Sequence, residues 1–280
     1  MTLNTLSTAK LKKLRTTIAY AHEKSGLYHK KYEHITNLDT FDDAGFLQLP
    51  FTTKKDLQEE GISGLTCIPM SQLAEVHYSS GSTSDPVASL WSYGDIARSS
   101  EQLSKTWALQ GVDANTIFGM MVQYGLFSAG LINHYALQHL GAFIVPMSNA
   151  PIARKLALIE EFGVKTTAAV GSTYIQLINE YRRQGIDPRM SPLQKVICGG
   201  EPLTEERRRY IERNLGVEVF DQYGLCEIDT GLAGECHRHT GLHVVDDHVI
   251  VEILDPQTLQ PVPDGTEGEL VLTTLGREAM

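Results

Sequence analysis

Several short segments of this 280-residue chain carry side chains that can bind phosphate, a metal ion or an organic acid. The first is "SSGSTSDP" at residues 79–86, a run of hydroxyl residues around Gly81. Hydroxyls and backbone N–H groups of such a loop can converge on the oxygens of a polyphosphate, and glycine permits a close approach. The run lacks the lysine of a G-x-x-x-x-G-K-[ST] loop, and Ser/Gly-rich runs also form plain connections. Taken alone, this run is consistent with a phosphate-binding loop and equally with a plain connection.

Two further polar segments each come at the end of an apolar run of strand length. "GGEPLTEE" begins at Gly199, and "DQYGLCE" begins at Asp221. In open α/β proteins, ligands bind beyond the carboxyl ends of parallel strands. We therefore expect both segments at the ligand-binding edge of a sheet.

Cysteine and histidine are grouped in "ECHRHTGLH", which contains Cys236, His237, His239 and His243. These residue types at such short separations can supply zinc ligands. A surface loop without a metal is the alternative.

The elements that position these segments follow from the hydrophobic pattern. From residue 116 onward, apolar runs alternate with amphipathic helical segments, which predicts a parallel sheet covered on both faces and hence an α/β fold. The expected strands are 116–124, 142–146, 165–171, 193–200 and 217–224, and the expected helices are 126–141, 151–163, 172–185 and 204–216. Residues 1–75 have a helical pattern, with Thr52 or Thr53 as a helix N-cap. The chain after residue 245 is β-rich and predicts a hairpin.

Charge and composition exclude several classes of protein. The net charge of −10 argues against a nucleic-acid partner, which requires a basic face. The basic run at 207–209 lies among glutamates at helical spacing, and we interpret it as a solvated helix face. No apolar segment is long enough for a membrane span, and the N-terminus does not resemble a secretory signal. Four scattered cysteines suit a reducing compartment, so a cytoplasmic location is expected.

In their order and separations, these segments resemble the adenylate-forming acyl-CoA synthetases, and specifically the phenylacetate–CoA ligase family, which includes coenzyme F390 synthetase-like proteins. The motifs that carry the resemblance are "YSSGSTSDP", "GGEPLTEE", "DQYGLCE", "ECHRHTGLHVVDDH" and "GTEGELVLTTLGREAM". The resemblance runs from about residue 10 to the last residue. It implies an AMP-binding α/β core at 76–245, with 1–75 as a helical region of the same domain and 246–280 as a β-rich subdomain.

The resemblance also implies a reaction. A carboxylic acid and ATP give an acyl-adenylate and pyrophosphate, and coenzyme A then displaces AMP to give a thioester. Such chemistry needs ATP, Mg²⁺ and CoA, because the charge must be neutralised where carboxylate and α-phosphate meet. The relatives' preference implies an aromatic or aryl-acetic acid such as phenylacetate. A homodimer is a further expectation on family grounds.

Residue roles carry over by position. The resemblance assigns the β- and γ-phosphates to Ser79, Ser80, Gly81, Ser82 and Thr83. It assigns the nucleotide to Gly199, Gly200, Glu201, Pro202, Asp221, Gln222, Tyr223 and Gly224. Glu227 would coordinate Mg²⁺, a hard cation that prefers oxygen ligands. Some relatives hold a structural metal through the counterparts of Cys236 and His243. The Cys-rich segment that completes that site is absent here, so His237 or His239 would have to substitute.

The acyl pocket is expected around "QYGLFSAGLINHYAL". Tyr124 and Phe127 would line an aromatic pocket, and His134 would orient the carboxylate as a donor. Ordinary packing of a helix on a sheet is the alternative for all three.

The sequence departs from the family pattern in three places. Ser84 replaces a usual glycine, and Cys226 replaces a hydroxyl residue next to Glu227. The chain also ends before the ribose-binding aspartate and before the mobile C-terminal domain with its catalytic lysine. Three readings therefore stay open: the adenylation domain of an acyl-CoA ligase, an adenylating enzyme that serves a carrier protein or a deazaflavin, and an inactive truncated nucleotide-binding module.

Overall fold

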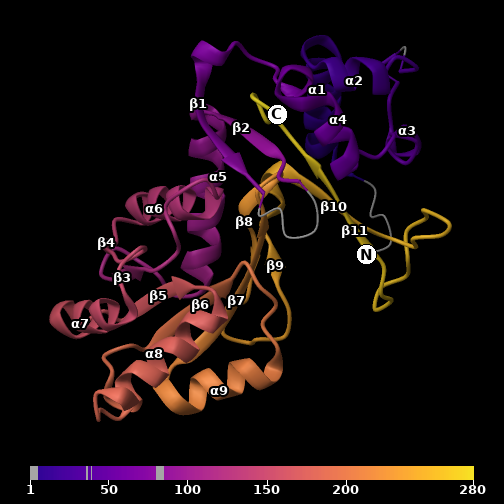
Figure 1. Ribbon diagram of the computed structural model, residues 1–280. Coiled ribbons are helices and arrows are strands. Elements are labelled where there is room, and N and C mark those ends of the chain that lie inside the picture. The colour runs from indigo at the N-terminus through magenta and orange to yellow at the C-terminus, as the bar shows by residue number, and fades with distance from the viewer. Residues whose placement is uncertain (1–5, 36, 39, 80–84) are drawn as a thin grey trace. The chain divides into compact units, whose positions relative to one another are not determined.

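The computed structural model describes residues 6–35, 37–38, 40–79 and 85–280 (Figure 1). The chain forms two compact units. The sheet unit is Ile96–Val245, and the composite unit combines Met1–Asp95 with Asp246–Met280. Residues 80–84, which hold most of the predicted phosphate loop, lie outside the described residues.

A seven-stranded sheet is the centre of the sheet unit. Its strand order is β4-β3-β5-β6-β7-β8-β9. The first five are parallel, and β8 and β9 are antiparallel to their neighbours. The strands are β3 (Ile117–Met120), β4 (Phe143–Pro146), β5 (Thr166–Ala169), β6 (Lys195–Gly199), β7 (Glu218–Leu225), β8 (Asp229–Gly234) and β9 (His243–Val244).

Helices cover both faces of this sheet (Figure 1). They are α5 (Tyr93–Leu109), α6 (Ser128–Leu140), α7 (Ile152–Phe162), α8 (Gly171–Arg183) and α9 (Glu205–Leu215), with a 3₁₀ turn η2 (Pro188–Met190). On one face, α7, α8 and α9 bury an apolar core that includes Ile159, Tyr174 and Ile211. On the other, Trp107 of α5 stacks on Phe118 of β3, with ring centroids 4.9 Å apart.

The composite unit is built from helices and two hairpins. Its elements are α1 (Thr8–Lys24), α2 (Gly26–Lys31), α3 (Asp43–Phe46), α4 (Lys54–Leu65), η1 (Met70–Gln72), β1 (Leu73–Tyr78), β2 (Ala88–Ser92), η3 (Asp246–His248), β10 (Val249–Leu254) and β11 (Glu269–Thr274). Thr53 and Asp56 form a capping box at the start of α4, so the predicted N-cap is confirmed at Thr53. The antiparallel pairing of β10 with β11 confirms the predicted C-terminal hairpin.

The last residues of the chain are bound within the composite unit. The Asp95 carboxylate accepts hydrogen bonds from the backbone N–H groups of Glu278 and Ala279 at 2.9 and 3.0 Å. The Arg277 guanidinium lies 4.6 Å from the centre of the Trp91 ring and donates to the Leu90 carbonyl at 2.8 Å. This segment is therefore an integral part of the unit.

The predicted α/β class and parallel sheet are confirmed, while β8 and β9 were not predicted. β8 reads "DTGLAG", which has neither alternation nor a run of β-branched residues. Its burial depends on contacts with α5 and β7, which a local pattern does not contain. Among the described residues, we find no helix with the length and apolar character that crossing a membrane requires.

Candidate functional site

The two segments that the sequence analysis assigns to the nucleotide, here called the nucleotide segments (199–202 and 221–224), lie side by side at the carboxyl edge of the parallel sheet. β6 ends at Gly199, which pairs with Gln222 of β7. A Cβ on Gly199 would come within 3.1 Å of the Gln222 carbonyl oxygen, so the backbones approach closely. Gly200 follows with φ +79°, a left-handed conformation that favours glycine. The chain can therefore turn sharply here and leave its backbone open to a ligand.

Glu201 is directed into the protein scaffold. Its Oε1 accepts hydrogen bonds from the Ser172 backbone N–H at 2.7 Å and from Arg207 Nη1 at 2.9 Å. The Arg207 guanidinium also donates to the Pro202 carbonyl at 3.3 Å. These contacts fix the path of 199–202 between the first residues of α8 and α9.

The second segment lies within β7. Gln222 Oε1 accepts a hydrogen bond from Trp107 Nε1 at 2.6 Å, which orients the amide. Burial raises the pKa of Asp221, and the charge of Glu235 raises it further. Burial also raises the pKa of the Tyr223 phenol, with a smaller contribution from the charge of Glu227. Tyr223 is half-buried and therefore keeps part of its ring accessible.

Glu227 lies in the turn between β7 and β8. The turn is closed by a hydrogen bond from the Ile228 N–H to the Leu225 carbonyl at 3.2 Å. The side chain of Glu227 is partly exposed, and its charge acts on the nearby Tyr223. A partly exposed carboxylate beside the nucleotide segments has the chemistry that an Mg²⁺ ion requires.

Tyr124 and His134 meet at the same edge of the sheet, beyond the carboxyl end of β3. Tyr124 Oη lies 2.8 Å from His134 Nδ1, and the rings contact edge to face. Burial lowers the pKa of His134 and raises that of Tyr124, so both are neutral at pH 7. Phe127 is the N-cap residue of α6 and is 44% exposed. The structure thus brings Tyr124 and His134 together and leaves Phe127 on the surface.

His134 gives the protein a defined response to acid. Because the pKa of His134 is lowered in the folded state, the unfolded chain takes up this proton first as the pH falls below about 6.5. We expect stability to decrease between pH 7 and pH 5, and this decrease to be smaller in the His134→Gln variant. Urea unfolding at several pH values measures it. His139→Gln, which alters an exposed histidine of the same helix, serves as the control for the substitution itself. Equal slopes for wild type and His134→Gln would contradict the assignment.

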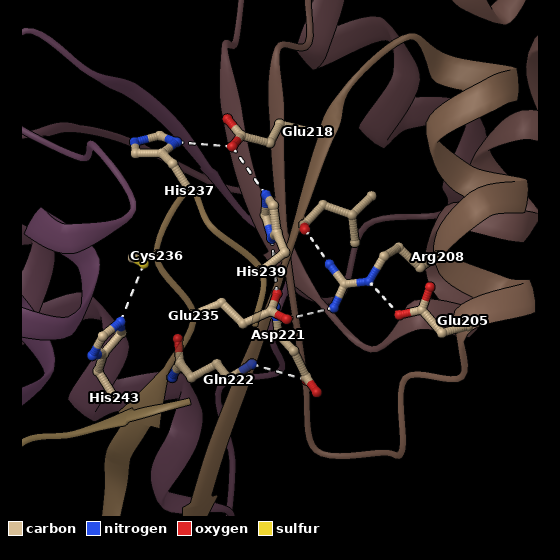
Figure 2. A network of polar contacts seen from close by, with 11 residues as sticks. Glu205, Arg208, Glu218, Asp221, Gln222, Glu235, Cys236, His237, His239 and His243 are labelled. Carbon is tan, nitrogen blue, oxygen red and sulfur yellow. Dashed lines mark hydrogen bonds and ion pairs between the residues drawn. The ribbon is translucent and has the colours of Figure 1, made fainter. Parts of the chain in front are cut away.

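The Cys/His segment does not form the expected zinc site (Figure 2). His243 Nε2 lies 3.1 Å from Cys236 Sγ, so these two predicted ligands do lie together. His237 and His239 instead contact Glu218 at 2.8 and 3.1 Å. Across the described part of the chain, no group of three or more Cys, His, Asp or Glu side chains is arranged to hold a metal ion. Neither His237 nor His239 joins Cys236 and His243 in this arrangement, so zinc binding at this segment is not shown.

The predicted phosphate loop is described only at its ends. The Ser79 N–H donates to the Val87 carbonyl at 3.0 Å, and the Val87 N–H donates to Ser79 Oγ at 2.9 Å. These two hydrogen bonds join the two ends of the connection between β1 and β2. Ser80, Gly81, Ser82 and Thr83 lie outside the described residues, so their assigned roles stay predictions.

The sequence analysis did not single out Arg208 and Glu235, which both contact the backbone of β7. Arg208 was interpreted as part of a solvated helix face, and this is wrong because the residue is only 8% exposed. Its guanidinium donates to the Val219 carbonyl at 2.5 Å and to Glu235 at 2.7 Å. The signal was available, since Arg208, Ile211 and Leu215 recur at the spacing of one helix face, and all three are buried.

Comparisons with known proteins show the family to which this chain belongs. The AMP-binding enzyme family matches residues 11–276. A phenylacetate-coenzyme A ligase of Aromatoleum evansii is 34% identical over 281 residues, which are 98% of this chain and 63% of the relative. The phenylacetate-coenzyme A ligase of Escherichia coli (strain K12) is 32% identical over 98% of this chain and 64% of the relative. The predicted sequence similarity to these ligases is therefore confirmed. This chain spans slightly less than two thirds of their length.

Solved structures confirm the fold. An open conformation of a 2-hydroxyisobutyryl-CoA ligase, in complex with 2-HIB-AMP and CoA, matches with a TM-score of 0.89. The match covers 97% of this chain and 66% of that chain at 21% identity. A benzoate CoA ligase from Burkholderia xenovorans LB400 matches with a TM-score of 0.59 over 76% of this chain and 42% of that chain, at 20% identity.

Proposed function

Because this chain belongs to the AMP-binding enzyme family, we propose that it is the adenylation part of an ATP-dependent acyl-CoA ligase. The acid it activates is aromatic or aryl-acetic, as in the phenylacetate-coenzyme A ligases to which its sequence is similar. The observation that carries the proposal is the pairing of Gly199 with Gln222, which brings two nucleotide segments together on adjacent parallel strands.

In the proposed reaction, an oxygen of the carboxylate attacks the α-phosphorus of ATP and pyrophosphate leaves. The thiolate of CoA then attacks the acyl carbon, and AMP leaves. The backbone around Gly200 and the ring of Tyr223 would hold the adenine. Mg²⁺, held by Glu227, would neutralise phosphate charge when bound. The roles of Ser79 to Thr83 on the β- and γ-phosphates are part of the same proposal.

The acyl pocket would use the Tyr124–His134 pair. If Tyr124 donates to His134 Nδ1, the other ring nitrogen of the neutral imidazole carries a proton. That N–H would donate to the carboxylate of the acid and orient it, while the Tyr124 ring would contact the aromatic group. Because burial lowers the pKa of His134, the donor stays a neutral N–H across the physiological range.

Two finer points belong to the proposal. All four cysteines are thiols, which supports a cytoplasmic location. Zinc is not included, because only Cys236 and His243 of the expected ligands lie together.

A direct test is the formation of an acyl-adenylate by the 280-residue chain. The protein is incubated with ATP, Mg²⁺ and either phenylacetate or a straight-chain acid of similar size, and products are identified by mass spectrometry. We expect phenylacetyl-AMP, because the proposal makes this chain the adenylation part of the enzyme. A Tyr124→Ala/His134→Ala variant should lose the preference for phenylacetate. ATP binding without acyl-AMP would instead favour a nucleotide-binding module without the enzymatic activity.

A further inference from the structure

We propose that Arg208 and Glu235 are positioning residues that hold the two nucleotide segments in fixed register (Figure 2). The inference rests on the proposed function for the identity of the ligand, and on the geometry of the sheet unit for the rest. Neither residue belongs to the motifs that the nucleotide would contact. Both instead contact backbone groups of β7.

Glu235 binds both backbone polar groups of Asp221. Its own N–H donates to the Asp221 carbonyl at 3.0 Å, and its Oε2 accepts from the Asp221 N–H at 2.8 Å. Asp221 is the first residue of the second nucleotide segment. With the carboxylate of Glu235 only 6% exposed, water cannot readily replace this acceptor. The path of the chain into Gln222 and Tyr223 therefore depends on Glu235.

Arg208 connects the first segment to the second. It lies on α9, whose N-cap Thr204 follows almost directly after residues 199–202. Its Nη1 donates to the Val219 carbonyl and its Nη2 to Glu235 Oε1, at 2.5 and 2.7 Å. One planar guanidinium thus binds the backbone of β7 and the carboxylate that holds Asp221. Such a rigid fork fixes direction as well as distance.

A histidine also contacts Glu235 of this pair. His239 Nδ1 lies 3.2 Å from Glu235, and His239 Nε2 lies 3.1 Å from Glu218, the first residue of β7. His239 therefore links Glu218, at the start of β7, to the carboxylate that accepts from the Asp221 N–H. A buried ion pair is weak evidence for stability alone, since apolar residues of similar volume often serve as well. Orientation of the Asp221 backbone is a function that apolar residues could not replace.

The decisive measurement is amide hydrogen exchange of Glu235→Gln by mass spectrometry, with no ligand present. We expect exchange across residues 217–225 to become at least about tenfold faster, since glutamine offers the Asp221 N–H only a neutral, weaker acceptor and loses the ion pair with Arg208. The matched control is Glu180→Gln, because Glu180 is likewise buried (7% exposed) and paired with an arginine. Its partners Arg183 and Gln184 lie at the end of α8, so 217–225 should keep wild-type protection. Unchanged exchange of 217–225 in Glu235→Gln would overturn the inference.

A double variant separates positioning from stability. Arg208→Met with Glu235→Leu removes both charges and should recover much of the melting temperature that Glu235→Gln loses. It offers no acceptor to the Asp221 N–H, so exchange at 217–225 should stay fast. Recovery of both the melting temperature and the protection would mean that the pair contributes stability only.

Titration with Mg·ATP then tests the proposed function and the positioning role separately. We expect wild type and Glu180→Gln to bind with the same affinity, and Glu235→Gln and the double variant to bind at least about tenfold more weakly. If wild type binds no nucleotide, the proposed function fails while the exchange data still decide the positioning role. If wild type and Glu235→Gln bind equally, Glu235 does not position the site.

Discussion

Replacement of Gly224 by alanine is expected to lower the free energy of unfolding by about 3 kcal/mol and to weaken Mg·ATP binding at least about tenfold. A Cβ at this position would overlap the Thr230 carbonyl group and would lie 2.7 Å from the Asp229 carbonyl oxygen. These atoms are backbone, so no side-chain rotation relieves the contact. β8 would have to move away from β7, and the nucleotide segment would move with it. Urea unfolding and calorimetric titration measure the two effects.

Gly125→Ala is the control for this prediction of stability. A Cβ there has no atom within 4 Å, and the residue does not have positive φ. Alanine should therefore be neutral or slightly stabilising, because it restricts the unfolded chain. If Gly224→Ala unfolds at the same urea concentration as Gly125→Ala, the close contact between β7 and β8 is not as described.

Arg208→Met should cost about 3–5 kcal/mol of folding free energy, the second large effect that we expect. The substitution keeps an unbranched, apolar side chain of nearly the same length but leaves the Glu235 carboxylate buried without its guanidinium. The Val219 carbonyl loses its donor as well. The midpoint of urea unfolding at pH 7 reports the loss.

The neighbouring arginine supplies a matched control. Arg209 is on the same helix, its side chain is 63% exposed, and it lies 3.6 Å from the exposed Glu205. Exposed ion pairs contribute little, so Arg209→Met should change stability by less than about 1 kcal/mol. Similar losses for Arg208→Met and Arg209→Met would contradict the burial of Arg208.

Much of the fold could be predicted because its signals are local. The alternation of apolar runs and helical patterns after residue 116 predicted five parallel strands, and the structure has β3, β4, β5, β6 and β7 there. Gly199 and Asp221 could be placed at one edge for the same reason, since parallel strands share their carboxyl ends. β8 depends on pairing with β7, and β9 on pairing with β8, and their own residues carry little preference for a strand.

The parts that could not be predicted depend on partners distant in the sequence. Arg208 and Glu235, which contact each other, are 27 residues apart in the sequence, and only Arg208 lies on α9. The charge pattern around Arg208 predicted a solvated face, and only the hydrophobic spacing of the helix could have corrected this. The arrangement of the Cys/His segment depends on a distant partner in the same way. Cys236 and His243 do meet, but Glu218 binds the two intervening histidines, and nothing in the local motif indicates that carboxylate.

The central claim is that the edge of the sheet formed by 199–202 and 221–224 binds a nucleotide. Isothermal titration of Mg·ATP into the 280-residue chain tests it most directly, with Tyr223→Ala as the paired variant. We predict saturable binding to one site and a clear loss of affinity in Tyr223→Ala. Wild-type protein that binds no Mg·ATP, or a Tyr223→Ala variant that binds as tightly as wild type, would contradict it.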